Sequence, residues 1–258
     1  MESYRIGICA GPGDVARAAA TGYDYIELDL NEVLPMDEDG YRAMARAMGE
    51  NNIYAEVVYG MLPPGLPIVG PEVSARHLHE ALDRSFDMAQ ALGAEQILFD
   101  CESARVTPAH FEPALAWRQL GNFIRILQSY AAKFDLKVAL LPLRRSAVEL
   151  MNYVSEAALI SAMLQLDRVG VAASSYNMAM EAESLHQLKR TGSLLWHMRT
   201  SNSLGNRPPQ AGDGEAYRKL FEALREMNYT GRVSCEARCA NFETEAAEAL
   251  RCLREASV

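Results

Sequence analysis

A repeated alternation of two kinds of segment constrains the fold of this chain more than any other feature. Short apolar or β-branched runs recur along the sequence, and each precedes a longer segment whose apolar positions are three and four residues apart. We count eight such units, and their order is typical of βα units around a parallel sheet. The expected strands are residues 4–10, 25–30, 54–59, 96–100, 137–141, 169–173, 194–198 and 232–236.

The segments between these strands show helical spacing most clearly in residues 74–92, 111–134, 215–227 and 242–253. Two connections, residues 59–72 and 202–214, are rich in glycine and proline and are predicted to be loops. Both follow expected strands. In a barrel they would lie at the C-terminal rim, where such folds carry their active sites.

The size of the chain predicts one domain. With 258 residues and a hydrophobic content of 49%, it can build a single large core, and α/β barrels of this length commonly form one unit. We therefore expect an α/β protein with a (β/α)8 TIM barrel that spans residues 1–258.

Charge and composition exclude several classes of partner. The net charge of −9 disfavours nucleic acid, because phosphate binding needs clustered lysine and arginine. No stretch approaches the roughly 18 apolar residues of a membrane span, and the N-terminus does not match a signal peptide, so we expect a cytoplasmic protein without a membrane partner. Five cysteines without paired spacing fit reduced thiols.

From Gly22 to the C-terminus, the chain resembles the xylose-isomerase-like sugar phosphate isomerase/epimerase family of TIM barrels, which includes hydroxypyruvate isomerases and ketose 3-epimerases. The resemblance rests on eight segments in order. They are GYDYIELDL (22–30), LPPGLPIVGPEV (62–73), LGAEQILFD (92–100), SARVTP (103–108), VALLPLRRS (138–146), VGVAASSYNM (169–178), GNRPPQAGDGEAY (205–217) and ALREMNYTGRVSCEAR (223–238).

The resemblance implies a reaction that moves a proton next to a carbonyl group. Family members hold a divalent cation (Mn, Mg, Co or Zn) with Glu, Asp, His and Glu at four strand ends. In this chain Leu141, Ser174 and Arg199 stand in place of the first three ligands, and Glu236 is the only one retained. We therefore expect no metal cofactor, because these side chains supply too few donors for such a cation.

Glu236 and His197 are the candidate catalytic residues. Arg199 lies at a neighbouring strand end, and we predict that it forms an ion pair with Glu236 in which the guanidinium replaces the charge of the metal. Such a pair could bind a substrate anion, or it could only neutralise a leftover carboxylate. His197 precedes Arg199 by two residues, so both side chains should point to the same side of the strand. The alternative to a catalytic role for His197 is a hydrogen-bonded residue of the barrel wall.

Other candidate substrate-binding residues follow from the resemblance. Arg207, Glu27 and Arg105 match family positions, and Asn177 stands where the family has a His that contacts the substrate. Arg144 and Arg145 directly follow the altered fifth strand, and two cations there suit an anionic ligand. The alternative for each arginine is a solvated surface charge, and the alternative for Glu27 is a structural hydrogen-bond acceptor.

Three functions remain open from the sequence. The first is a degenerate homologue that binds a sugar, a sugar phosphate or a keto acid without metal-dependent turnover. The second is an active metal-free isomerase or epimerase that uses Glu236 with His197 and Arg199. The third is a non-catalytic barrel used for assembly, and a homo-oligomer is compatible with all three.

Overall fold

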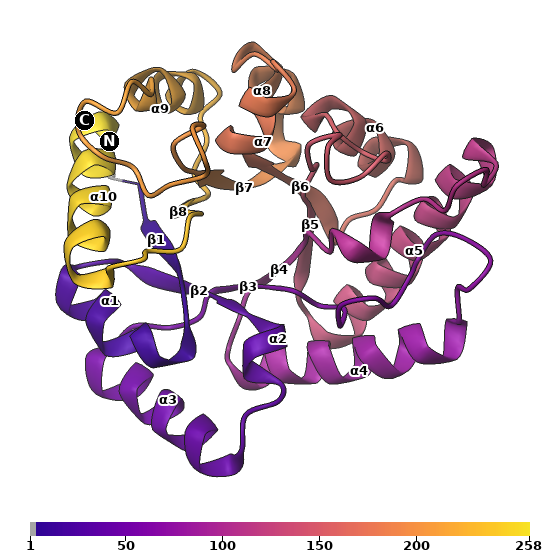
Figure 1. Cartoon of the computed structure of the whole chain (residues 1–258), viewed down its shortest axis with the longest axis horizontal. Coiled ribbons are helices and arrows are strands. Elements are labelled where there is room, and N and C mark those ends of the chain that lie inside the picture. Colours follow the sequence, from indigo (N-terminus) through magenta and orange to yellow (C-terminus); the bar gives the residue numbers. More distant parts are fainter. Residues whose placement is uncertain (1–3) are drawn as a thin grey trace.

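The computed structural model describes residues 4–258 and shows a closed barrel of eight parallel strands (Figure 1). Each strand pairs with the next along the chain, and β8 pairs with β1 to close the ring. The strands are β1 (Ile6–Ala10), β2 (Tyr25–Asp29), β3 (Val57–Tyr59), β4 (Gln96–Phe99), β5 (Lys137–Leu140), β6 (Val169–Ser174), β7 (Leu195–Thr200) and β8 (Arg232–Cys235).

Helices surround this ring on the outside, as Figure 1 shows. They are α1 (Val15–Thr21), α2 (Leu30–Val33), α3 (Glu38–Asn51), α4 (Ala75–Ala91), α5 (Pro113–Phe134), α6 (Val154–Leu164), α7 (Ser175–Met180), α8 (His186–Thr191), α9 (Tyr217–Glu226) and α10 (Phe242–Ser257), with short 3-10 turns η1 (Pro12–Asp14), η2 (Ser103–Arg105) and η3 (Gly192–Leu194). Within residues 4–258, no helix is long and apolar enough to cross a membrane.

The predicted (β/α)8 barrel is confirmed. All eight expected strands are present, and their ends differ from the prediction by at most three residues. The largest difference is in β3, which begins at Val57, whereas Tyr54 is exposed at the edge of the barrel. Both loops rich in glycine and proline are irregular, and the second contains an isolated bridge between Asn202 and Arg207.

The interior of the barrel is filled by alternate residues of the strands. Tyr25, Val57, Leu98, Ala139 and Ala172 belong to one buried cluster, which is separate from the core between the strands and the helices. The next inward-facing residues lie two positions further along each strand, closer to its C-terminal end. Polar side chains gather at this end of the barrel.

Tyr25 fits into the interior because β1 carries a glycine beside it. A Cβ atom on Gly7 would lie 2.3 Å from the Tyr25 ring, so only glycine leaves room for this side chain. The Tyr25 hydroxyl also forms a 2.8 Å hydrogen bond with Ser234 Oγ on β8. The middle of the barrel is thus packed by side chains from its strands.

None of the five cysteines forms a disulfide bond, as expected. Cys9, Cys101, Cys235 and Cys252 are buried, and Cys239 is half-buried.

Candidate functional site

A cavity of about 550 Å³ opens at the C-terminal ends of the strands. Six of these strand ends contribute lining residues, which are Asp29, Tyr59, Asp100, Leu141, Arg199 and Glu236. Its position agrees with the rim at which TIM barrels assemble their active sites.

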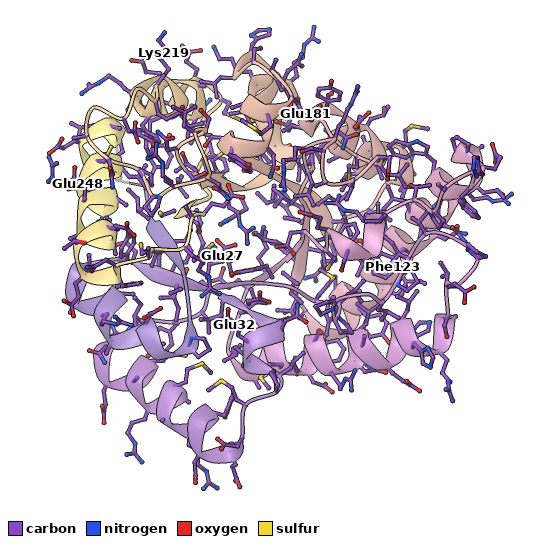
Figure 2. The ribbon with its side chains drawn as sticks, in the orientation of Figure 1. Glu27, Glu32, Phe123, Glu181, Lys219 and Glu248 are labelled. Atoms are coloured by element: carbon purple, nitrogen blue, oxygen red, sulfur yellow. The ribbon has the colours of Figure 1, made fainter. Side chains whose placement is uncertain are left out.

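A buried charge cluster lies beneath this cavity, near the middle of the ring where Figure 2 labels Glu27. Arg199 Nε donates a 2.7 Å hydrogen bond to Glu27 Oε1, and His197 Nε2 lies 3.3 Å from Glu27 Oε2. Glu27 and His197 are fully buried, and Arg199 is 5% exposed. The prediction that His197 and Arg199 point to the same side of β7 is therefore confirmed.

The charges in this cluster fix the ionisation of Glu27. Burial alone would raise the pKa of Glu27, but Arg199 and His197 outweigh burial and hold that pKa well below its usual range. Burial likewise opposes the charge of Arg199, but Glu27 and further acidic neighbours keep its pKa well above the ordinary value. The two side chains therefore form a charged pair inside the barrel.

Arg199 also contacts two residues that line the cavity. Its guanidinium carbon lies 4.5 Å from the centre of the Tyr59 ring, and Nη1 lies 3.5 Å from Asp100 Oδ2. A cation over an aromatic face gains electrostatic stabilisation, most of all where water is excluded. The guanidinium is thereby held at the floor of the cavity.

Two carboxyl groups beside Arg199 have raised pKa values. Burial raises the pKa of Asp100 and that of Glu236, although Arg199 partly offsets the effect at both. Glu236 Oε2 accepts a 2.5 Å hydrogen bond from Ser174 Oγ, and Asp100 Oδ1 accepts one of 3.2 Å from the Gly60 amide. Carboxyl groups with raised pKa values in a cleft are suited to proton transfer.

The predicted ion pair between Arg199 and Glu236 is wrong. Among the ion pairs within residues 4–258, Arg199 pairs with Glu27 and Asp100 but not with Glu236. The long arginine side chain turns down toward Glu27, where burial makes an opposite charge most favourable. Glu236 is left to accept the hydrogen bond from Ser174.

The remaining predicted site residues separate into two groups. Asn177 lines the cavity, and its Oδ1 accepts a hydrogen bond from the Arg144 amide. Arg145 and Arg207 are exposed, and they bond Glu181 and the Leu204 carbonyl instead of lining the cavity. A substrate-binding role for these two arginines stays a prediction.

Arg105 is fully buried behind the cavity wall. Its Nη2 donates to the Leu141 carbonyl at 3.1 Å, and its guanidinium lies over the Phe99 ring. Burial lowers its pKa to about 10. The structure therefore places Arg105 as a support for the end of β5, and contact with a ligand stays a prediction.

Arg144, predicted together with Arg145 from its place after the fifth strand, lines the cavity. Sequence reasoning missed other lining residues, chiefly Asp29, Tyr59 and Asp100. All three stand at or next to the ends of expected strands. A polar residue at the C-terminal end of a barrel strand was the signal that could have identified them.

Within residues 4–258, no group of three or more His, Cys, Asp or Glu side chains is placed to hold a metal ion. At the positions that correspond to three of the metal ligands of the resembled family, Leu141 presents hydrocarbon, Ser174 donates to Glu236, and Arg199 presents a cation. A guanidinium repels a divalent ion, so this set of side chains does not fit one.

Comparisons with known proteins agree with the barrel. Residues 15–256 match the family model described as xylose isomerase-like TIM barrel. No curated protein sequence matches the chain at a significant level.

Several solved structures are similar in fold. A 3-keto-D-glucoside 4-epimerase from E. coli has a TM-score of 0.81 and 21% identity, covering 98% of this chain and 99% of that one. A D-psicose 3-epimerase with D-tagatose from Clostridium cellulolyticum H10 has a TM-score of 0.78 and 16% identity, covering 98% and 95%. An AP endonuclease, family 2, from Brucella melitensis has a TM-score of 0.78 and 16% identity, covering 96% of each chain. At these identities the likeness shows the fold alone.

Proposed function

Because the chain belongs to the xylose isomerase-like TIM barrel family, we propose that it binds a neutral sugar in the cavity at the C-terminal ends of its strands, without a divalent cation. The observation that carries this proposal is the buried guanidinium of Arg199, held by Glu27 at the floor of the cavity. Its donors can bind the oxygens that a cation would otherwise bind.

The charges of the lining favour a neutral ligand over a sugar phosphate or a keto acid. Four carboxyl groups line the cavity (Asp29, Asp100, Glu102 and Glu236) against two guanidinium groups (Arg144 and Arg199). Arg199 is already paired with Glu27, and Arg144 lies 3.6 Å from Glu102. An anion would meet unpaired carboxylates, whereas sugar hydroxyls can donate hydrogen bonds to them.

Ligand-induced thermal stabilisation tests this proposal. The panel contains D-fructose, D-psicose and D-tagatose, with fructose 6-phosphate and pyruvate as anionic counterparts, each measured with and without EDTA. We expect a neutral sugar to raise Tm equally in both conditions, and Glu236→Gln to weaken this effect. Glu222→Gln on the exposed face of α9 is the matched control.

Stabilisation that EDTA abolishes would contradict metal-free binding. Stabilisation by the anionic compounds alone would contradict the choice of a neutral ligand. A barrel used only for assembly would respond to no compound in the panel.

A second function, metal-free isomerisation or epimerisation, is favoured by the position of Asp100. Leu141 cannot transfer a proton, so this reaction needs another acid beside Glu236. Asp100 lines the same cavity, and its Oδ2 accepts a 3.5 Å hydrogen bond from Arg199 Nη1. Glu236 would remove the proton next to the carbonyl, and the C–H electron pair would form the C=C bond of an enediolate. Arg199 would stabilise the new oxyanion, and Asp100 would return a proton to carbon.

Proton exchange separates this second function from binding. Incubation of a bound sugar in ²H₂O should place deuterium next to the carbonyl if the reaction occurs. Glu236→Gln should stop the exchange, and Asp100→Asn should stop formation of the isomerised or epimerised product. Absence of exchange in a sugar that raises Tm would reject the reaction and leave binding as the function.

The unpaired cysteines support a reducing compartment, and we propose the cytoplasm on that basis.

A further inference from the structure

The barrel has a second cavity at the opposite end, where its strands begin. It measures about 390 Å³ and is lined by residues at the beginnings of four strands, which include Gln96 of β4, Lys137 of β5, Trp196 of β7 and Arg232 of β8. None of these residues takes part in the site at the C-terminal ends.

An irregularity in β7 presents Trp196 to this cavity. The pairing of β6 with β7 shifts between Val171 and Ala172, so that Trp196 has no partner in the register. Bulges of this kind redirect a side chain and often occur beside functional sites. A Cβ atom on Gly170 would lie 2.2 Å from the Trp196 ring, so the neighbouring strand gives up a side chain to accommodate the indole.

Gln96 brings an amide nitrogen without a hydrogen-bond partner to the same cavity. It is 4% exposed, and its Nε2 atom is buried without a hydrogen-bond partner. Buried polar groups are almost always hydrogen-bonded, because an unpaired one keeps the full cost of losing water. An unpaired amide nitrogen on a residue that lines a cavity is a donor that a bound acceptor oxygen would satisfy.

Lys137 supplies a cation beside that amide. Gln96 and Lys137 are direct partners in the β4–β5 register, so their side chains leave the sheet on the same face. The Lys137 ammonium lies 5.6 Å from the centre of the Trp196 ring, and it takes part in no ion pair among residues 4–258. Arg232, in contrast, is paired with Glu56 and Glu95.

We propose that this cavity binds a small anion with a carboxylate or phosphate group, held between the Lys137 ammonium and the Gln96 amide against the Trp196 ring. The ammonium provides the charge, the amide provides a directed hydrogen bond, and the indole excludes water from one side. This site lies outside the proposed sugar cavity and does not depend on it.

Trp196 makes the binding directly observable. The chain has two tryptophans, and Trp117 is 37% exposed on α5. In a Trp117→Phe variant, the emission of Trp196 should change saturably as inorganic phosphate or malonate is added at constant ionic strength. Use of both probes distinguishes a phosphate ligand from a carboxylate ligand.

Three variants in that background test the assignment. Lys137→Met and Gln96→Leu should each weaken the response about tenfold, since each removes one bond to a charged ligand. Lys219→Met is the matched control, because Lys219 is an exposed lysine on α9, which Figure 2 shows at the outside of the molecule. Its titration should equal that of the parent.

The proposal is overturned if neither anion produces a saturable change, or if all variants respond alike, which would indicate a general salt effect. Should Gln96→Leu fail to fold, Lys137→Met decides alone, because Lys137 is exposed and tolerates the change.

Discussion

At the scale of the residue, Arg199 determines the electrostatics of the barrel interior. It neutralises Glu27, which is fully buried, and it lies beside Asp100 at the floor of the cavity at the C-terminal ends of the strands. A single guanidinium thus has a structural partner below it and a proposed ligand above it. The two roles predict separate effects on stability and on binding.

Arg199→Met should lower the free energy of unfolding by about 3–5 kcal/mol, because Glu27 is left as an unpaired buried carboxylate. Urea unfolding at neutral pH measures this loss. The double variant Arg199→Met with Glu27→Gln should recover much of it, because the amide carries no charge. Arg207→Met, at an exposed loop position, should change the value by less than about 0.5 kcal/mol.

Glu236 should destabilise the fold as pH rises. Burial raises its pKa above the ordinary value of 4.5, so its contribution to stability is present below that value and is lost as pH rises through the folded pKa. Glu236→Gln keeps the shape of the protonated acid. The variant should therefore be more stable than the parent at pH 8, and the difference should shrink toward pH 4. A difference in unfolding free energy that does not change with pH would contradict the raised pKa.

At the scale of the element, the packing of β1 against β2 depends on a missing side chain. Gly7→Ala should lower the free energy of unfolding by about 1–3 kcal/mol, because the new methyl group would overlap the Tyr25 ring. Gly121→Ala, on α5 with no atom within 4 Å of the added carbon, should instead raise it by about 0.5–1 kcal/mol. Equal effects of the two substitutions in thermal unfolding would show that the interior can yield at Tyr25.

The sequence predicted elements better than their local irregularities. The alternation of apolar runs and helical segments predicted all eight strands, because each pattern repeats over many residues. The displaced register at Trp196 has no such signature, since a bulge changes the pairing of two strands but not the composition of either. The tryptophan was therefore not recognised as a cavity residue.

At the scale of the whole molecule, the sequence predicted which strands carry the residues of the candidate site, but not which of these residues form ion pairs. Strand order placed Glu236, His197 and Arg199 at neighbouring strands, and alternation placed the last two on one side of β7. The partner of Arg199 is Glu27, which lies 172 positions away in the sequence. Whether Arg199 pairs with Glu27 depends on how far β2 and β7 are shifted along the barrel axis relative to each other. The residue pattern of one strand does not predict this shift.

The closed ring also controls the chemistry of its sulfur atoms. Burial raises the pKa of all five thiols, to about 12 at Cys101 and Cys239 and about 11 at Cys252. An alkylating reagent must reach the sulfur atom, so iodoacetamide should modify half-buried Cys239 first and the four buried cysteines only when the barrel opens. Mass spectrometry during a urea series measures this order, and early modification of Cys9 or Cys235 would contradict it. If the expected order holds, the alkylated cysteines record irreversibly which parts of the barrel have opened at each urea concentration.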